Sequence, residues 1–597
     1  MKSILKNISN KAKTLLRNTK LFKRIGIFVL CFVAMVVLVI TGLYFYLQYK
    51  YPEAIVLEGA YYDISSLDIQ FSDRDISGTY NPNDAVKINV FDNIIECDAD
   101  EKLSIENKVI EINSSGTYVL SGSLKDGMII VSAGEEDKVQ LVFNNFDLSN
   151  SSNPAIYIRS ADKVFLTTAE KTINTVSDGK GYTYTDGDNN VDAAIFSKTD
   201  LTLNGFGELI VTGNTAHGIV SKDDLVIGCG AYRIDSVKKA LNGKDCVKVY
   251  NCEMVLNSGT DGICSDNTED ATRGYIYIKS GKIDIDCGND GIQAENVLVL
   301  DNPIINITSG GGSINAPEKE SDKAKGRYEN EATQEEESTE SRKGLKSAKD
   351  ILISAGTYTI DSYDDSIHAD NSIKIDGGEF CIKSGDDAIH ADHTLQITNG
   401  SIEIEKSFEG LEAYQIAVKG GDISIIASDD GINAASESTA ITEITGLFAM
   451  HTMGKLEITD GTLLVNSEGD SLDSNGVFTI SGGVVLVAGP QNGGGGDGIV
   501  DCDGRKTVSG GIVLCIGKAN SRFGDSDDYF DTEGQLQIVK SLETHPKGTL
   551  IELKDPNGAV LVTLLAPKDF DLIVATAEGL ASETDYVFFL DENKYAE

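Results

Sequence analysis

A short phrase recurs along this chain at nearly constant spacing: an acidic residue, a small one, an aliphatic one, a polar one and usually a second small one. It begins at Asp261, Asp290, Asp365, Asp387, Glu409, Asp430, Asp470 and Asp497. From Asp365 to Asp430 the successive steps are 22, 22 and 21 residues. A fixed period of this length is typical of a solenoid, in which each repeat packs on the next.

The content of each repeat indicates strands and turns rather than helices. Between the phrases lie short alternating or aliphatic runs such as SIKID, TLQIT, GSIEIE and GDISIIA, separated by Gly, Asn and Asp. Each 22-residue unit holds two or three such strands. We therefore expect an all-β fold, a parallel β-helix of about a dozen coils of ~22 residues each.

The first 47 residues differ from the rest. Residues 1–24 carry eight Lys or Arg and no acid, and residues 25–47 carry no charge. A run of this length is long enough to span a bilayer. The positive-inside rule then predicts a single-pass membrane protein, a signal anchor with a cytoplasmic N-terminus and the bulk of the chain outside the cell. A cleaved signal peptide is the alternative, but the run is long for one and no clear cleavage site follows.

The remainder of the chain is strongly acidic. Removing eight positive charges from the net charge of -42 leaves -50 for residues 25–597. Such a surface repels nucleic acid and anionic lipid, and it is compatible with metal cations. We expect a β segment or cap over 48–103, the β-helix over 104–520 with a disordered insertion at 317–342, and a small C-terminal β region over 521–597.

The repeat predicts a column of carboxylates. If each phrase occupies the same corner of successive coils, its acids lie about 4.8 Å apart. Two such charges repel by roughly 3 kcal/mol at an effective dielectric constant of 20. A bound Ca²⁺ would relieve this repulsion, because hard cations select carboxylate oxygens. The predicted metal ligands are Asp261, Asp290, Asp364, Asp365, Asp386, Asp387, Asp429 and Asp430.

Other interpretations of the same residues stay open. Asp-Gly and Asp-Asp pairs also form turns without any metal. His368 and His390 occupy equivalent places in two neighbouring phrases. They could be metal ligands or a general base, or they could form an outward polar stack that is hydrogen-bonded to neighbouring acids. Lys343 places a cation in the column and makes a continuous row of metal sites doubtful there.

Several longer strings resemble a known family. SGTYVLSG at 115–122, HGIVSKDDLVI at 217–227, NGKDCVKV at 242–249 and GYIYIKSGKIDI at 274–285 resemble the bacterial carbohydrate-binding domain-containing proteins. The resemblance covers about residues 70–520. It implies a right-handed, calcium-binding parallel β-helix, similar in shape to family 9 polysaccharide lyases, that binds polysaccharides such as polygalacturonate and cellulose.

Together with the N-terminal segment, the resemblance predicts a membrane-anchored extracellular protein that binds an acidic, pectin-like polysaccharide, or another plant or cell-wall polysaccharide, through Ca²⁺. A calcium-dependent polysaccharide lyase acting on a uronate-containing glycan is the alternative, and a structural cell-surface spacer or adhesin is a second one. No catalytic residue is expected under the binding hypothesis; for a lyase the bases would be Lys346, Lys383 or Lys406. Because the chain has no Trp, the residues expected to contact sugar are Tyr275, Tyr277, His368, His390 and Tyr414.

Overall fold

The structure is a computed structural model of the chain. It describes residues 6–7, 9–11, 13, 61–97, 101–183, 190–319, 340–434, 454–491, 498–502, 504–519, 530–533, 535–580, 582, 586–591 and 593–594. The chain divides into two compact units, Met1–Val56 and Leu57–Glu597. The described residues of the first unit are helical and exposed. Where the second unit is described, its strands form one sheet of 44 and another of four.

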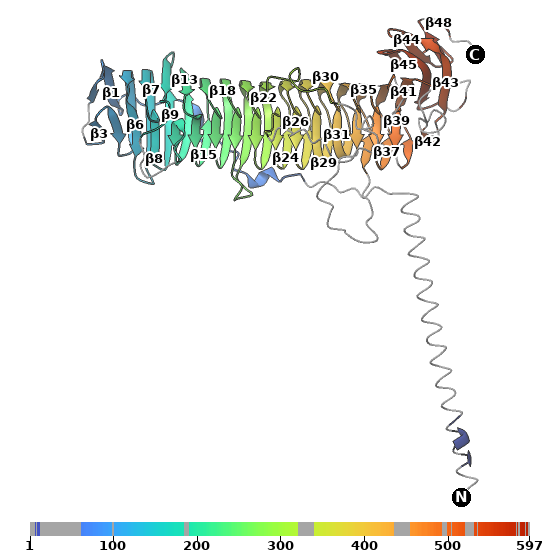
Figure 1. Cartoon of the computed structure of the whole chain (residues 1–597), viewed down its shortest axis with the longest axis horizontal. Coiled ribbons are helices and arrows are strands. Elements are labelled where there is room, and N and C mark those ends of the chain that lie inside the picture. Colours follow the sequence, from blue (N-terminus) through green and yellow to red (C-terminus); the bar gives the residue numbers. More distant parts are fainter. Residues whose placement is uncertain are drawn as a thin grey trace. The chain divides into compact units, whose positions relative to one another are not determined.

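Strands of the large sheet lie side by side along its length (Figure 1), and in the described residues most of them pair in parallel within three long ladders. The first ladder carries the repeated phrase. Its strands, each hydrogen-bonded to the next, are β4 (Val109–Ile112), β6 (Met128–Ser132), β8 (Ile156–Ser160), β11 (Ala193–Ser197), β14 (His217–Ser221), β17 (Leu241–Gly243), β19 (Ile263–Ser265), β21 (Ile292–Ala294), β23 (Leu345–Ser347), β26 (Ile367–Ala369), β29 (Ile389–Ile397), β31 (Leu411–Val418), β33 (Ile432–Ala434), β36 (Leu472–Ser474) and β39 (Val500–Cys502).

The second ladder follows the first along the chain and shares β29 and β31 with it. Its other strands are β7 (Lys138–Ser149), β9 (Lys163–Thr168), β12 (Asp200–Gly205), β15 (Asp224–Ile227), β18 (Cys246–Ser258), β20 (Tyr275–Cys287), β22 (Val297–Ser309), β24 (Asp350–Ile353), β27 (Ser372–Ile375), β34 (Lys455–Ile458), β37 (Val477–Ile480), β40 (Lys506–Val508) and β42 (Asp531–Thr532).

The third ladder shares β5 (Gly116–Lys125), β7, β18, β20 and β22 with the second, and β1 (Val86–Phe91) extends the second ladder by pairing with Tyr118–Gly122 of β5. The other strands of the third ladder are β10 (Ile173–Ser177), β13 (Glu208–Gly213), β16 (Gly230–Ser236), β25 (Thr357–Ser362), β28 (Glu379–Ser384), β30 (Ser401–Ser407), β32 (Asp422–Ala427), β35 (Thr462–Ser467), β38 (Val484–Ala488) and β41 (Ile512–Gly517).

Antiparallel strands complete both ends of the large sheet. At one end, β2 (Ile94–Cys97) pairs with β1, and β3 (Leu103–Glu106) pairs with β4. At the other end, β46 (Phe570–Ala577) lies between β41 and β43 (Gln537–His545). The four-stranded sheet contains β44 (Leu550–Lys554), β45 (Val560–Leu565), β47 (Val587–Leu590) and β48 (Asn593–Lys594).

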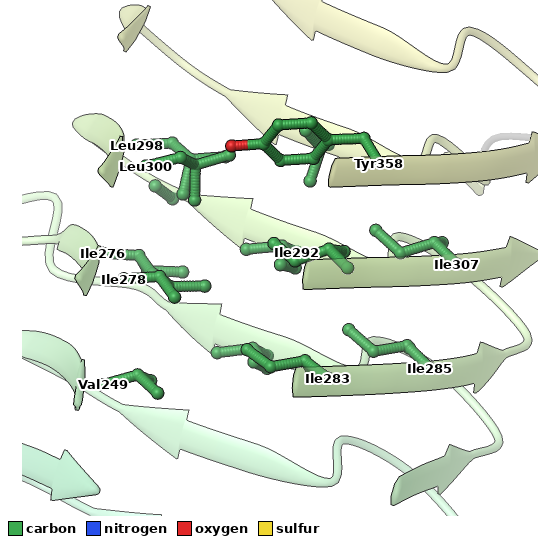
Figure 2. Packing of buried hydrophobic residues seen from close by; sticks show 14 of the residues in the cluster. Val249, Ile276, Ile278, Ile283, Ile285, Ile292, Leu298, Leu300, Ile307 and Tyr358 are labelled. Carbon is green, nitrogen blue, oxygen red and sulfur yellow. The ribbon is translucent and has the colours of Figure 1, made fainter. Parts of the chain in front are cut away.

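Aliphatic side chains fill the space between the ladders. The third residue of each phrase points inward, so the first ladder contributes a stack of fully buried Ile and Leu that includes Ile292, Ile367 and Ile389. Figure 2 shows Ile292 near Ile283, Ile285 and other members of this core. The next residue of the phrase points the other way, because side chains alternate along a strand. The burial pattern of β21, β23, β26, β33 and β36 accordingly reads buried, intermediate, buried.

The fold class predicted from the sequence is wrong. Instead of a right-handed β-helix of about a dozen coils behind a transmembrane helix, the described residues of the second unit form one 44-stranded sheet, a four-stranded sheet and two short helices, η1 (Ile64–Ser66) and α2 (Asp73–Ser77). No helix in the described part of the chain is long and apolar enough to cross a membrane. The predicted span 25–47 lies outside the described residues.

The reason for the difference in the sheet is visible in its longest strands. A repeat spacing reports how often the chain returns to an equivalent place, but not which strands share a sheet. Strands β18, β20 and β22 run for 13 residues each and pair within both the second and the third ladder. These strands therefore join the second and third ladders, which the repeat in the sequence does not connect. Strands β1, β43 and β46, which lie outside residues 104–520, also belong to this sheet.

Candidate functional site

The first residues of successive phrases lie next to one another at the entrance to the first ladder. We call this set the corner column; it comprises Lys239, Asp261, Asp290, Lys343, Asp365, Asp387, Glu409, Asp430 and Asp470. The amide that follows each member donates to the carbonyl of the next, as Ser366 does to Asp387 and Ala388 does to Glu409. The acids at 22-residue spacing are therefore close neighbours in space.

Backbone amides stabilise several of these carboxylates. Oδ1 of Asp365 accepts from the amide of Asp387 at 3.2 Å, and Oδ1 of Asp387 accepts from that of Glu409 at 3.2 Å. Asp430 in turn accepts from the amide of Asp470 at 2.6 Å. Each bond favours the ionised carboxylate. The sequence analysis did not foresee this contribution, which offsets part of the repulsion along the column.

Lys343 supplies a positive charge inside the column. Its Nζ lies 2.5 Å from Oδ2 of Asp365 and 3.4 Å from Oδ1 of Asp364. Burial alone would raise the pKa of Asp365, but Lys343 and the neighbouring histidines hold it well below its usual range. Lys319 makes a second ion pair with Asp386. The protein's own lysines thus occupy part of the region where calcium was predicted.

Negative charge accumulates further along the column. Burial raises the pKa of Asp387 well above its usual range, and Asp365, Asp386 and Glu409 raise it further. Burial and neighbouring acids raise the pKa of Glu409 in the same way. These two groups therefore favour the protonated, neutral form unless a cation lies nearby.

The fourth residues of the phrases form a second set, which we call the central column. It contains one residue from each of β23, β26, β29, β31, β33 and β36 in direct register: Lys346, His368, His390, Glu412, Asn433 and Asp473. All six are partly exposed. Adjacent strands are about 4.8 Å apart, so this face presents a regular series of hydrogen-bonding side chains to solvent.

Acids surround the two histidines of the central column. Nδ1 of His368 lies 2.9 Å from Oδ2 of Asp365, and its Nε2 lies 3.1 Å from Asp370. Although burial opposes it, the contacts with Asp365 and Asp370 raise the pKa of His368 to about 9. The ring of His390 packs edge-on against that of His368, with 4.8 Å between their centroids.

The structure brings some of the predicted metal ligands together and separates others. Oxygens of Asp364, Asp365 and Asp386 lie within 4.8 Å of one another. Asp261 contacts Lys239 at 3.5 Å, and Asp290 contacts Lys346 at 3.4 Å. Asp429 is buried beside the column. A group made only of carboxylates joins Asp430 to two residues that were not predicted as ligands, Asp470 and Asp473.

The tyrosines expected to bind sugar do not form an open surface. Tyr275 and Tyr277 are buried in a small cluster with Leu67 and Phe71, from the segment that precedes the sheet. The hydroxyl of Tyr275 donates to the carbonyl of Asp68 at 2.7 Å. Tyr414, in β31, is also buried.

The three candidate lyase bases lie in different surroundings. Lys346 belongs to the central column, beside His368. Lys383 and Lys406 are register partners on the third ladder. Lys383 pairs with Glu405 at 2.9 Å, and Lys406 donates to the carbonyl of Ser313 at 2.6 Å. The three amines therefore do not converge on one point.

The sequence analysis missed Glu412 and Asp473 as members of the site. Both occupy the fourth position of a phrase, in EGLEA and DSLDS. The alternation of side chains along a strand places this position on the opposite face from the buried aliphatic residue. Reading the fourth position in every phrase, rather than only where it is His, would have found both residues.

Comparison with known proteins identifies the family. The family model described as carbohydrate-binding domain-containing protein matches residues 106–388 and 386–541, which is more than half of the chain. The chain belongs to this family. A carbohydrate-binding domain-containing protein of Acetivibrio thermocellus is 32% identical over 227 residues, which cover 38% of this chain and 79% of that protein. The resemblance noted in the sequence is thereby confirmed.

One solved structure is also similar to this member of the family. It is described as a polysaccharide lyase-like protein from C. thermocellum, a gadolinium derivative. It is 31% identical to this chain, with a TM-score of 0.37, and the match covers 38% of this chain and 92% of that one.

Proposed function

We propose that this protein binds polysaccharide along the first ladder and does so with the help of Ca²⁺. The observation that carries the proposal is the family match over residues 106–541, which contain nearly all of the three ladders. The central column supports it, because six polar side chains at regular intervals on parallel strands suit a ligand that is itself a linear repeat.

An acidic, pectin-like glycan is the proposed ligand class. The chain has a net charge of -42, so a polyanion would be repelled unless a cation lies between the two. A divalent cation bound to protein carboxylates can also accept carboxylate oxygens from a uronate. This requirement links the calcium proposal to the choice of ligand.

Asp430, Asp470 and Asp473 are the proposed calcium ligands. They offer oxygens that lie within 4.8 Å of one another. Ca²⁺ takes six to eight oxygen ligands, so three carboxylates leave positions for water, for backbone carbonyls and for the glycan. Asp473 belongs to the central column, which would place the ion where a ligand can reach it.

The proposal includes a location outside the cell. It is supported by the order of the first segments in the sequence, in which a basic stretch at 1–24 precedes an uncharged stretch at 25–47. A protein outside the cell can reach polysaccharides of the plant or cell-wall type.

Retention of the purified full chain on immobilised polygalacturonate and on cellulose would test the proposal. We expect retention on polygalacturonate in Ca²⁺ and release by a chelator. Asp473→Asn should weaken retention, whereas Asp460→Asn, at an exposed turn, should not. Absence of retention on any polysaccharide, with Ca²⁺ present, would overturn the proposal in favour of a structural role.

A calcium-dependent lyase remains the second candidate. The observation that favours it is the position of Lys346 in the central column, in register with His368, on the face proposed to bind the glycan. Its ion pair with Asp290, at 3.4 Å, would have to open before the amine could act as a base. The same incubation distinguishes the two functions, since a lyase produces unsaturated uronate ends that absorb in the ultraviolet. Lys346→Met should abolish that product if Lys346 is the base, and Lys383→Met is the matched control.

A further inference from the structure

Three carboxylates surround one nitrogen of His390 at similar distances. Its Nδ1 lies 3.4 Å from Oε2 of Glu412, 3.6 Å from Oδ2 of Asp387 and 3.7 Å from Oδ2 of Asp365. An N–H···O hydrogen bond measures about 2.7–3.2 Å between heavy atoms. All three contacts are longer than that, so none of them is an ordinary hydrogen bond.

The distances correspond instead to the spacing between ligands of one metal ion. Zn²⁺ binds His nitrogen and carboxylate oxygen at about 2.0–2.2 Å in tetrahedral geometry. Two donors at the tetrahedral angle are then roughly 3.3–3.5 Å apart. The donor atoms of Asp387, His390 and Glu412 all lie within 4.8 Å of one another. Only small side-chain movements would bring them onto a common ion.

Asp365 is the least suitable of the three carboxylates. Its Oδ2 already contacts Nζ of Lys343 at 2.5 Å and Nδ1 of His368 at 2.9 Å. A metal ion at this oxygen would face the lysine directly. Glu412 lies on the other side of His390 from that ion pair, since it is the register partner of His390 on β31, whereas His368 is its partner on β26.

The local charge favours a divalent ion. Two carboxylates, those of the buried Asp387 and of Glu412, share this one nitrogen of His390. A protonated His390 would bring one positive charge to this group. A divalent ion would bring two and would remove the mutual repulsion of Asp387 and Glu412 directly.

We propose that Asp387, His390 and Glu412 form a binding site for a first-row divalent transition metal, of which Zn²⁺ is the simplest case. Imidazole selects such metals over Ca²⁺ and Mg²⁺, which prefer oxygen ligands alone. Oδ1 of Asp392 lies 3.6 Å from Nε2 of His390, too far for a hydrogen bond as it stands but near enough to form one, and so to orient a metal-bound imidazole, after a small movement. The site is distinct from the proposed calcium ligands and does not depend on the glycan.

Titration of the chelator-treated full chain with Co²⁺ alone tests the proposal. Tetrahedral or five-coordinate Co²⁺ gives intense visible absorption, and Zn²⁺ should abolish it by competition at one equivalent. Ca²⁺ in excess should not. His390→Gln should weaken Co²⁺ binding by about tenfold or more, while His393→Gln, three residues further along β29, should bind as the parent does.

Three results would overturn the proposed metal site. These are a Co²⁺ spectrum that stays octahedral and weak, equal binding by the parent and His390→Gln, or displacement of Co²⁺ by Ca²⁺. Because His390→Gln could fold poorly, Glu412→Gln provides a second variant, and melting curves in chelator show whether each is folded. No polysaccharide enters the experiment, so its outcome is independent of the proposed binding function.

Discussion

Nζ of Lys343 lies 2.5 Å from Oδ2 of Asp365, its successor in the corner column by one repeat of 22 residues. Both groups are buried, with 14% and 3% of their side chains exposed. Lys343 stands at a position where most phrases have an acid, and it neutralises the acid of the following phrase, Asp365. Lysines likewise contact two earlier acids of the column, Asp261 and Asp290.

Replacing Lys343 by Met should destabilise the fold. The variant leaves the buried carboxylate of Asp365 without its main cation, and breaking a buried ion pair in this way costs about 3–5 kcal/mol. Urea denaturation followed by circular dichroism measures the change in the free energy of unfolding. Lys171→Met, at a side chain that is 85% exposed, should change it by less than about 0.5 kcal/mol.

The double variant Lys343→Met with Asp365→Asn provides a stricter check. Since it removes both charges, it should recover part of the lost stability. Equal stability of the parent and the single variant would show that the pair contributes nothing.

His368 should make the stability depend on pH. Contacts with Asp365 and Asp370 raise its pKa to about 9 despite burial, whereas an unperturbed histidine has a pKa of about 6.5. A raised pKa in the folded state means that protonation favours folding. The contribution is complete below pH about 6.5 and is lost as the pH rises through about 9. The shift corresponds to at most about 3 kcal/mol.

Urea denaturation of the parent and of His368→Gln across this window, in chelator, measures the contribution. The two curves of unfolding free energy against pH should converge as the pH rises. Asp370→Asn, which removes the contact 3.1 Å from Nε2, should move the convergence to lower pH. Curves that stay parallel from pH about 6 to about 10 would contradict the assignment.

The neighbourhood of the acids was predictable because it follows from one local rule. Residues at the same place in successive repeats lie on adjacent strands, so Asp365, Asp387 and Glu409 meet whatever the rest of the chain does. The aliphatic third position and the family resemblance were equally accessible from the phrase itself. The balance of charge could not be predicted from the sequence, because it depends on amide hydrogen bonds and on how far the side chain of Lys343 reaches.

The burial of the tyrosines could not be predicted from the repeat. Tyr275 and Tyr277 are covered by Leu67 and Phe71, which lie some 200 residues earlier in the chain. No periodicity connects the two segments, so exposure of the tyrosines could not be judged from their own strand. The joining of ladders by the long strands β18, β20 and β22 is a similar case.

The buried position of Tyr275 leads to a prediction about binding. Tyr275→Phe removes the hydrogen bond of 2.7 Å to the carbonyl of Asp68, and it should lower the free energy of unfolding by about 1 kcal/mol. Retention on polysaccharide should not change. Weaker retention at unchanged stability would instead show that this tyrosine contacts sugar. Phe71→Ala, which loosens the same cluster, should increase hydrogen exchange of the segment 61–71.

Calcium should stabilise the chain through Asp430, Asp470 and Asp473. An ion that binds only the folded state adds about 2.7 kcal/mol when its concentration is one hundred times its dissociation constant. The melting temperature should therefore rise with added Ca²⁺ and fall again in chelator. Asp473→Asn should lose most of this rise, because it removes one of three carboxylates whose oxygens lie within 4.8 Å of one another. Asp460→Asn should keep the rise, since that residue is exposed.

If Ca²⁺ raised the melting temperature of Asp473→Asn as much as that of the parent, the ion would have to bind elsewhere. A parent that did not respond to Ca²⁺ at millimolar concentration would exclude a calcium site of useful affinity at this corner of the sheet.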